Sequence, residues 1–287
     1  MQKILVLGSK GQIGNPLSVF LRLNGFIVDE LDIEISETHD LRRKTESLTS
    51  SFKDADFVIF LAYDVGGSKY LSKYQHSKAF LDNNLMIMLT VFDLLSEFGK
   101  NFLFASSQMS NMTHSSYGTL KAIGEHYTRS LNGRIIKFWN VYGYETVISK
   151  AHVVTDFIDS ALIDGEIKML TSGQESRQFL HVEDCSRAIL ELLRSYDSLK
   201  LGVSYDITSF LDSTILDVAN IVAEETGAKV KVGQSIDSVQ KDARNLPNEN
   251  ILEFWSPKIS IEEGIKRVIE ESKRNLETRI KLRIEEK

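Results

Sequence analysis

Three glycines near the start of the chain restrict its fold more than any other feature. The segment GSKGQIG, residues 8–14, follows the short apolar run KILVL and precedes apolar residues at helical spacing. Glycines between a strand and a helix permit a tight turn, close backbone approach to a pyrophosphate, and an anion at the helix N-terminus. The loop is therefore predicted to bind a dinucleotide through Gly8, Gly11, Gln12, Ile13 and Gly14.

Short β-branched runs alternate with longer segments of helical period through the first two hundred residues, a pattern typical of parallel sheets covered by helices. We expect strands at 3–7, 26–31, 57–62, 101–105, 134–139 and 203–208. Their helical partners are expected near 13–24, 78–98, 117–131, 183–195 and 214–226. The sequence predicts an α/β protein with a Rossmann-type doubly wound parallel sheet.

Asp32 lies at the end of the second expected strand, about 20 residues after the glycine loop. A carboxylate there would accept hydrogen bonds from the adenosine ribose, and no arginine follows closely to neutralise a 2′-phosphate. These features favour NAD over NADP. Asp40 and Leu41 lie where the next loop could touch adenine, although a plain helix start explains Asp40 equally well.

The alternating pattern loosens from about Lys150 onward, which indicates a smaller lobe interleaved with the first. We expect residues 1–150, joined again by 180–207, to form the NAD-binding domain. Residues 151–179 and 208–287 are expected to form the substrate-binding lobe. The last stretch, residues 260–287, is expected to be one charged helix.

The charge of the chain excludes several kinds of partner. A net charge of −6 offers no general attraction to nucleic acid or acidic membranes, so we expect a small-molecule partner. The single cysteine, Cys185, excludes an intrachain disulfide and a cysteine metal cluster, and no metal site is expected. No signal peptide or membrane span is evident, which predicts a soluble cytoplasmic protein.

Tyr117 and Lys121 lie one turn apart on an expected helix, so the ammonium can lie near the phenol. A free tyrosine has a pKa near 10, so service as a base at neutral pH requires positive charge nearby. Ser107, at the end of an expected strand, can supply a hydroxyl to the same substrate oxygen. Together they could remove a proton from an alcohol while hydride leaves its carbon.

Seven motifs occur in order between Lys3 and about Ile265. They are the glycine loop, LAYDVGG (61–67), DNNLMI (82–87), ASS (105–107), YGTLK (117–121), FWNVYG (138–143) and SRQFLHVED (176–184). This series resembles the extended short-chain dehydrogenase/reductase family, and in particular its NAD-dependent nucleotide-sugar epimerases, dehydratases and reductases. The resemblance implies a catalytic trio of Ser107, Tyr117 and Lys121. It also implies cofactor contacts from Leu61, Ala62, Asn84 and Phe138.

The same resemblance implies a nucleotide-diphosphate sugar as substrate. Asn140 and Arg177 match family positions that hold the diphosphate, and a guanidinium gives paired hydrogen bonds to phosphate oxygens. Arg244 is a looser match for a second phosphate ligand. A surface salt bridge is the alternative interpretation of either arginine.

Single residues separate the possible reactions of this family. Gln108 and Met109 stand where its dehydratases carry an Asp-Glu pair, and Met109 also replaces a cysteine that transfers protons in its 3,5-epimerases and in GDP-fucose synthase. AHVVTDFI, residues 151–158, resembles the fucose-synthase segment that carries a catalytic histidine. His152 therefore fits either a proton-transfer role or an ordinary helix start.

Hydride transfer at a sugar carbinol, most often C4, remains as the expected chemistry, with Tyr117 as the base. A 4-epimerase similar to UDP-galactose 4-epimerase, or a dehydrogenase, is the first interpretation. A 4-keto nucleotide-sugar reductase similar to GDP-fucose synthase is the second. Only nine residues, 108–116, separate Ser107 from Tyr117, which predicts an open pocket and admits a non-catalytic NAD-binding sensor or scaffold as a third.

The expected helix at 84–98 is apolar on almost every side, more than packing on one sheet face requires. Its apolar residues include Leu85, Met88, Leu89, Phe92 and Leu95. With the Tyr117 helix beside it, as the resemblance implies, we predict a homodimer that associates through a four-helix contact.

Overall fold

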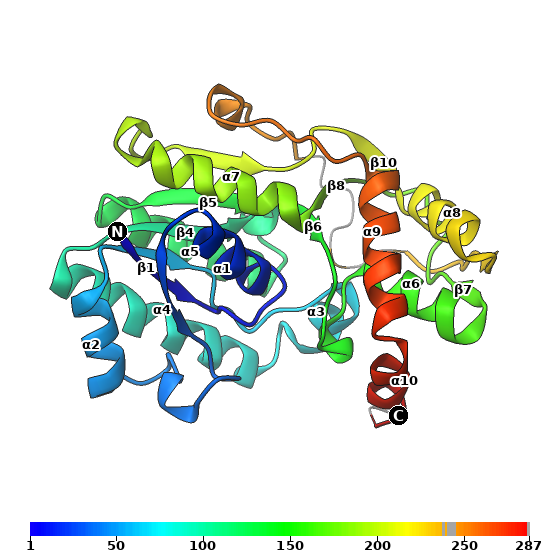
Figure 1. Ribbon diagram of the computed structural model, residues 1–287, viewed down its shortest axis with the longest axis horizontal. Helices are drawn as coiled ribbons and strands as arrows, with labels where there is room; N and C mark the ends of the chain where they lie inside the picture. Colours follow the sequence, from blue (N-terminus) through cyan, green and yellow to red (C-terminus); the bar gives the residue numbers. More distant parts are fainter. Residues whose placement is uncertain (237–238, 240–244, 286–287) are drawn as a thin grey trace.

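Six parallel strands form the central sheet, in the order β2-β1-β3-β4-β5-β9 (Figure 1). The computed structural model describes residues 1–236, 239 and 245–285. The strands are β1 (Lys3–Leu7), β2 (Ile27–Leu31), β3 (Phe57–Phe60), β4 (Asn101–Ser107), β5 (Arg134–Phe138) and β9 (Ser204–Ile207). Each pairs in parallel with its neighbours.

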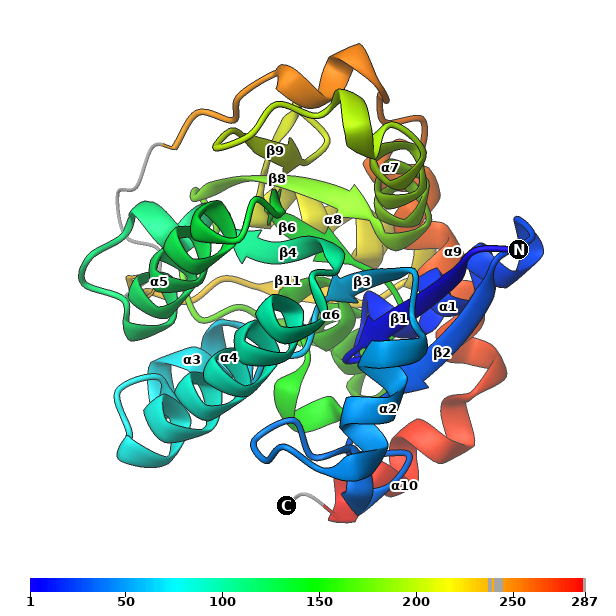
Figure 2. The same ribbon diagram turned by 90° about the vertical axis from the view of Figure 1, so that its left-hand side faces the viewer.

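Helices cover both faces of this sheet, because alternate strand residues point to opposite sides. Ile4 and Val6 pack with α1 (Gly14–Leu23) and α7 (Val182–Arg194). Leu5 and Leu7 belong to the opposite core, with α2 (Glu46–Asp54), α4 (Lys78–Phe98) and α5 (Ser116–Ser130). Figure 2 shows α4 and α5 side by side along the sheet. The doubly wound α/β fold predicted from the sequence is confirmed.

The strand order reverses at β1, because the chain passes from β1 to β2 on one side and returns to β3 on the other. Ligands of doubly wound folds bind where the order reverses, at the carboxyl ends of the strands. Gly8 follows β1 there with a positive φ of 83°. A Cβ on Gly8 would lie 2.7 Å from the backbone of Ala62, just after β3. The two strand ends can approach this closely only because residue 8 is glycine.

A second, smaller group of elements packs beside the sheet around its own core. Three helices contribute to it: α6 (Val153–Asp164), α8 (Ile215–Thr226) and α9 (Ile261–Arg274). One small sheet has the order β10-β8-β6, with β10 (Asp212–Thr214), β8 (Ser176–His181) and β6 (Asn140–Tyr142). Another pairs β11 (Lys229–Lys231) with β7 (Glu166–Lys168). The division at residues 150, 179 and 207 stays a prediction.

Short helices connect the larger elements. They are α3 (Ser68–Tyr74) and the 3₁₀ helices η1 (Glu37–His39), η2 (Gln108–Asn111), η3 (Ile148–Lys150), η4 (Tyr196–Ser198) and η5 (Asn250–Glu253). The connection between Ser107 and Tyr117 consists of η2 and one further turn, capped by Ser115. Residues distant in the sequence contact this connection: His114 lies 3.1 Å from the carbonyl oxygen of Val239, and the Asn245 amide donates to the carbonyl oxygen of Gln108 at 2.7 Å.

The C-terminal stretch is two helices, where the sequence predicted one. Helix α9 ends at Arg274, and α10 (Leu276–Glu285) begins after Asn275. Arg279 of α10 is buried and forms an ion pair with Asp159 of α6. Its backbone-directed hydrogen bond reaches the carbonyl oxygen of Glu145 at 2.7 Å. Helix α10 is therefore held against α6 by a buried ion pair, which the charged sequence did not predict.

Judged by length and composition alone, helix α4 could cross a bilayer, although no membrane span was predicted from the sequence. Among the described residues it is the one helix that meets this test. Phe80, Met88, Phe92 and Leu95 are buried against the sheet, as in the core helix of a globular protein. Val91 and Leu94 are buried as well, whereas Met86 and Leu89 are exposed.

Replacing Gly14 by alanine should destabilise the protein by about 1–3 kcal/mol, the cost of overpacking a close contact. The new Cβ would lie 2.1 Å from the carbonyl oxygen of Gly8, a backbone atom that cannot move aside. Urea unfolding of the cofactor-free protein measures this loss. Gly11→Ala is the matched control, because its Cβ would meet the same oxygen at 3.4 Å. Equal stability of the two variants would contradict the prediction.

Candidate active site

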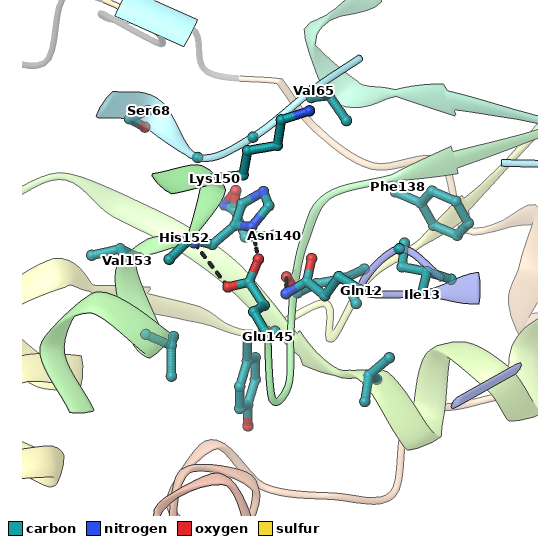
Figure 3. A pocket seen from close by; sticks show the side chains of 18 of the residues that line it. Gln12, Ile13, Val65, Ser68, Phe138, Asn140, Glu145, Lys150, His152 and Val153 are labelled. Carbon is teal, nitrogen blue, oxygen red and sulfur yellow. Dashed lines mark hydrogen bonds and ion pairs between the residues drawn. The ribbon is translucent and has the colours of Figure 1, made fainter. Parts of the chain in front are cut away.

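A cavity of about 1290 Å³ opens between the carboxyl edge of the sheet and the smaller group of elements. The glycine loop, Asp32, Ser107, Tyr117 and Lys121 all line it, although they come from four separate parts of the chain. Figure 3 shows the side chains of Gln12, Ile13 and Phe138 on one side of the cavity view, with Lys150, His152 and Ser68 on the other. The volume of the cavity is large enough to take two ligands at once.

The glycine-loop end of the cavity fits a dinucleotide. Gly11 lines the cavity, and a Cβ added there would meet only the carbonyl oxygen of Gly8. The first turn of α1, which carries no acidic residue, begins directly behind the loop. Asp32 lies at the loop edge, where its carboxylate accepts hydrogen bonds from the backbone N–H groups of Lys10 (2.8 Å) and Glu34 (3.0 Å). The carboxylate is thereby held at the cavity rim, where a ribose would lie.

Ser107 and Tyr117 meet at the sheet edge. Ser107 is the last residue of β4, and its hydroxyl caps η2 by accepting from the N–H of Met109 at 3.2 Å. Tyr117 lies in the first turn of α5, whose N-cap Ser115 fixes the helix start. Both side chains line the cavity. The short connection therefore brings the predicted pair together directly.

Burial shifts the pKa values of Tyr117 and Lys121 in the cofactor-free protein. Burial raises the pKa of Tyr117 to about 12, and the hydrogen bond from Ser107 opposes that rise. Burial lowers the pKa of Lys121 to about 7, although the charge of Glu125 opposes it. The ammonium donates to the carbonyl oxygen of Ala105 at 2.7 Å. The phenol is thus neutral before any ligand brings positive charge.

Tyr63 is a further aromatic residue of the site that the sequence reading did not single out. Its ring centroid lies 3.6 Å from the Lys121 nitrogen, and its ring meets that of Tyr117 edge-on at 5.8 Å between centroids. Tyr63 follows β3 and lines the cavity. The cation–π contact holds Lys121 beside the sheet edge. The motif LAYDVGG contained this signal, since a tyrosine stands at the end of an expected strand, directly after Leu61 and Ala62.

Five residues predicted near the cofactor do not line the cavity: Asp40, Leu41, Leu61, Ala62 and Asn84. Asp40 instead makes a paired interaction with the guanidinium of Arg42, which lowers the pKa of Asp40. Asn84 is buried in α4 and binds the backbone of Asp64 through both atoms of its amide. Phe138, at the end of β5, does line the cavity.

Two of the three residues predicted to hold a diphosphate line the cavity. Asn140 begins β6, and Arg177 lies in β8, in the small sheet of the second group of elements. The third, Arg244, lies outside the described residues. Met109 is buried and Gln108 bonds Asn245 through its side-chain oxygen at 2.8 Å. Neither residue offers a carboxylate or thiol to the cavity.

His152 forms a close pair with Glu145, a residue that the sequence reading missed. The ring nitrogen Nδ1 lies 2.7 Å from the Glu145 carboxylate, which also accepts from the His152 backbone N–H at 2.9 Å (Figure 3). Burial lowers the pKa of His152, but the charge and hydrogen bond of Glu145 outweigh it, so the net pKa is raised. A carboxylate and a histidine seven residues apart in an irregular loop have no periodicity that could have revealed the pair.

A doubly wound sheet with a glycine loop, a ribose-facing carboxylate and a buried tyrosine–lysine pair defines an α/β enzyme that uses a dinucleotide. The family model described as NAD dependent epimerase/dehydratase family matches residues 4–208. The chain belongs to this family, it is an enzyme, and its cofactor is NAD. The resemblance inferred from the seven motifs is confirmed.

Similar proteins extend over nearly the whole chain. UDP-glucuronate 4-epimerase of Thermodesulfobacterium geofontis is 23% identical, with 95% of this chain and 97% of the relative covered. GDP-L-fucose synthase 1 of Arabidopsis thaliana is 26% identical, with 92% and 90% covered. The solved structure of an epimerase from Methanothermobacter thermautotrophicus superposes with a TM-score of 0.84 at 22% identity, covering 98% of this chain and 94% of that one.

Glu145→Gln should lower the pKa of His152, because the variant removes the charge that favours the imidazolium. Because the pKa of His152 is raised on folding, this group contributes to stability. The contribution is complete below the pKa of the unfolded chain, about 6.5, and is lost as the pH rises through the pKa of the folded chain. The lowered pKa of Glu145 contributes above about 4.3 and is lost as pH falls through its folded value. The stability lost in the variant should therefore be largest between these two limits.

NMR titration of the histidine ring signals and urea unfolding at pH 5.5 and 8.5 measure both effects. Glu97→Gln is the control, because Glu97 is an exposed carboxylate that pairs with Lys44 on the surface. An unchanged His152 pKa in Glu145→Gln would show that the pair is not ionised.

Proposed function

We propose that the protein is an NAD-dependent nucleotide-sugar 4-epimerase that transfers hydride at the C4 carbinol, with Tyr117 as the base. The observation that carries this proposal is that Ser107, Tyr117 and Lys121 line the same cavity as the glycine loop. A dehydrogenase would use the same residues for one half of the reaction. Similarity to a UDP-glucuronate 4-epimerase over nearly all of both chains supports the epimerase.

The glycine-loop end is proposed to hold NAD. Gly8, Gly11, Gln12, Ile13 and Gly14 would surround the pyrophosphate, and Asp32 would accept from the adenosine ribose. Phe138, which lines the cavity, would flank the reactive ring. Asp40, Leu41, Leu61, Ala62 and Asn84 lie outside the cavity lining, so their contacts with the cofactor stay a prediction from the sequence. Bound NAD supplies a hydride acceptor that can return the hydride to either face of a ketone.

Tyr117 would take the proton of the C4 hydroxyl, while Ser107 donates a hydrogen bond to the same oxygen. The buried phenol has a pKa of about 12 in the cofactor-free protein, so it needs positive charge nearby to ionise near neutral pH. Lys121 supplies one charge one turn along α5, and its own pKa of about 7 makes this charge sensitive to the surroundings. Tyr63 would keep Lys121 in place through its ring face.

The substrate is proposed to be a nucleotide-diphosphate sugar lying between the two predicted lobes. Asn140 and Arg177 would bind the diphosphate, Arg177 through paired hydrogen bonds. The absence of an acidic or thiol side chain at residues 108 and 109 argues against dehydration and against full 3,5-epimerisation, since both need proton transfer there. A 4-keto sugar reductase is the second candidate, favoured by the similarity to GDP-L-fucose synthase 1.

The exposed apolar face of α4 and α5 is proposed to form a homodimer through a four-helix contact. Met86 and Leu89 of α4 and Tyr127 of α5 are all exposed by more than a third of their surface. Of the five residues named from the sequence, Met88, Phe92 and Leu95 face the protein core, so Leu89 is the better candidate for the contact. The two helices lie together, which makes one continuous face.

Tyr117→Phe should lower kcat for epimerisation at least about 100-fold, because the variant cannot accept the proton. NAD binding should stay unchanged, since the hydroxyl is the only atom lost. Incubation with UDP-, GDP-, CDP- and dTDP-sugars, followed by NMR of the product and by NADH absorbance, measures the reaction. Epimer without net NADH indicates the epimerase, and stoichiometric NADH indicates a dehydrogenase. Tyr74→Phe is the control, and full activity of Tyr117→Phe would sink the mechanism.

Leu89→Glu should convert a dimer into a monomer, because a carboxylate would be buried in an apolar contact. Light scattering at micromolar concentration gives the mass of each variant. Leu201→Glu is the control, since Leu201 is also exposed but lies outside α4 and α5. A monomeric mass for the unaltered protein would refute the dimer.

A further inference from the structure

Two cations at one wall of the cavity, Lys150 and His152, are each paired with a carboxylate, and neither pair has a role in the mechanism above. Lys150 pairs with Asp64 at 2.9 Å, and His152 pairs with Glu145 at 2.7 Å. Lys150 and His152 both line the cavity and are separated by one residue. In each pair the cation is the more exposed partner, 39% against 20% for Lys150 and 38% against 7% for His152.

The carboxylates of Asp64 and Glu145 accept hydrogen bonds from residues of the wall itself. Asp64 accepts from the Tyr70 hydroxyl at 2.6 Å and from the Asn83 amide at 3.3 Å, besides the Lys150 ammonium. Glu145 accepts from the backbone and the ring of His152. An ammonium has three donors and an imidazolium two, so each cation keeps donor capacity beyond its partner. Across the described residues, no hydrogen bond to Nε2 of His152 is found.

The wall is rigidly built, so these donors are already in place before a ligand arrives. Gly67 donates to the carbonyl oxygen of Lys150 at 2.9 Å, and a Cβ on Gly67 would lie 2.3 Å from the carbonyl oxygen of Ala151. On the other side, Arg279 holds the carbonyl oxygen of Glu145 at 2.7 Å and lies over the Tyr144 ring. Preorganised donors lose little conformational entropy when they bind an anion.

The other anionic groups expected in the cavity already have partners elsewhere. The glycine loop accounts for the cofactor pyrophosphate, and Asn140 with Arg177 accounts for the substrate diphosphate under the proposed function. The loop that carries Asp64 and Val65 continues from Tyr63, whose ring touches that of Tyr117. Lys150 lies beside Val65 (Figure 3), and both line the cavity with Tyr63 and Tyr117. Under the proposed function the Lys150–His152 wall therefore borders the space where a sugar held at Tyr117 would lie.

We propose that the substrate sugar is a hexuronate, whose C5 carboxylate accepts hydrogen bonds from the Lys150 ammonium and from Nε2–H of His152. The inference rests on the proposed function, because it places a nucleotide sugar in this cavity. Two cationic donors with their counter-charges turned away match the two oxygens of one carboxylate. A neutral hydroxymethyl group at C5 would leave both donors without a charged partner.

The test compares sugars that differ only at C6, with the NAD-loaded full chain: UDP-glucuronate against UDP-glucose, and GDP-mannuronate against GDP-mannose. We expect kcat/KM to be at least about tenfold higher for the uronate of the accepted pair, from hydrogen bonds to charged groups. His152→Gln and Lys150→Gln should each lower the uronate value about tenfold and leave the neutral sugar within about twofold. Lys44→Gln, a surface lysine paired with Glu97, is the matched control.

Calorimetric binding to NAD-loaded Tyr117→Phe gives the charge preference even without turnover. Tighter binding of the uronate by this variant, together with no turnover of either sugar by the unaltered protein, would overturn the proposed function and support this inference. Equal binding of both sugars would overturn this inference alone. UDP by itself should bind the two wall variants normally; a matching loss with UDP would assign the cations to the diphosphate and refute the hexuronate. Deuterium incorporation at C5 in D₂O, lost in His152→Gln, would identify His152 as a proton-transfer residue and would also refute it.

Discussion

The contact between two backbones at the end of β1 is the constraint on which the rest of the protein depends. Gly8 lies against the backbone of Ala62, and Gly14 lies against the carbonyl oxygen of Gly8, with no room for a Cβ at either position. The first contact fixes the spacing of β1 and β3, and the second fixes where α1 begins. One side of the cavity is therefore set by steric exclusion, before any ligand contributes energy.

The sequence predicted the sheet well, because period and length are local properties. All six expected strands are present in the central sheet, and their ends differ from the structure by no more than two residues. The errors lie where tertiary contacts decide. The C-terminal segment breaks at Asn275, because Arg279 must turn inward to reach Asp159. An all-round apolar α4 also gave no indication of which of its residues face the sheet, since the pattern is equally apolar on each side.

In the candidate site, too, residues on regular elements could be predicted from the sequence, whereas residues brought together by irregular loops could not. Tyr117 and Lys121 could be paired from their spacing on one helix, and Ser107 from its place at a strand end, because regular elements fix those positions. Glu145 and His152 could not, since they meet through an irregular loop whose path depends on the buried guanidinium of Arg279. Leu61, Ala62 and Asn84 came from the family pattern, and here their side chains serve the core and the backbone of Asp64.

The position of Arg279 has a consequence for the order in which the protein is made. Residues 276–285 leave the ribosome after every other described element, yet Arg279 supports the carbonyl group of Glu145 and hence the cavity wall. The strands of the central sheet are complete once β9, residues 204–207, has been made, and domains fold as units during translation. The Glu145 side of the cavity also needs helix α10. A growing chain can therefore complete its central sheet before this wall of the cavity has its last support.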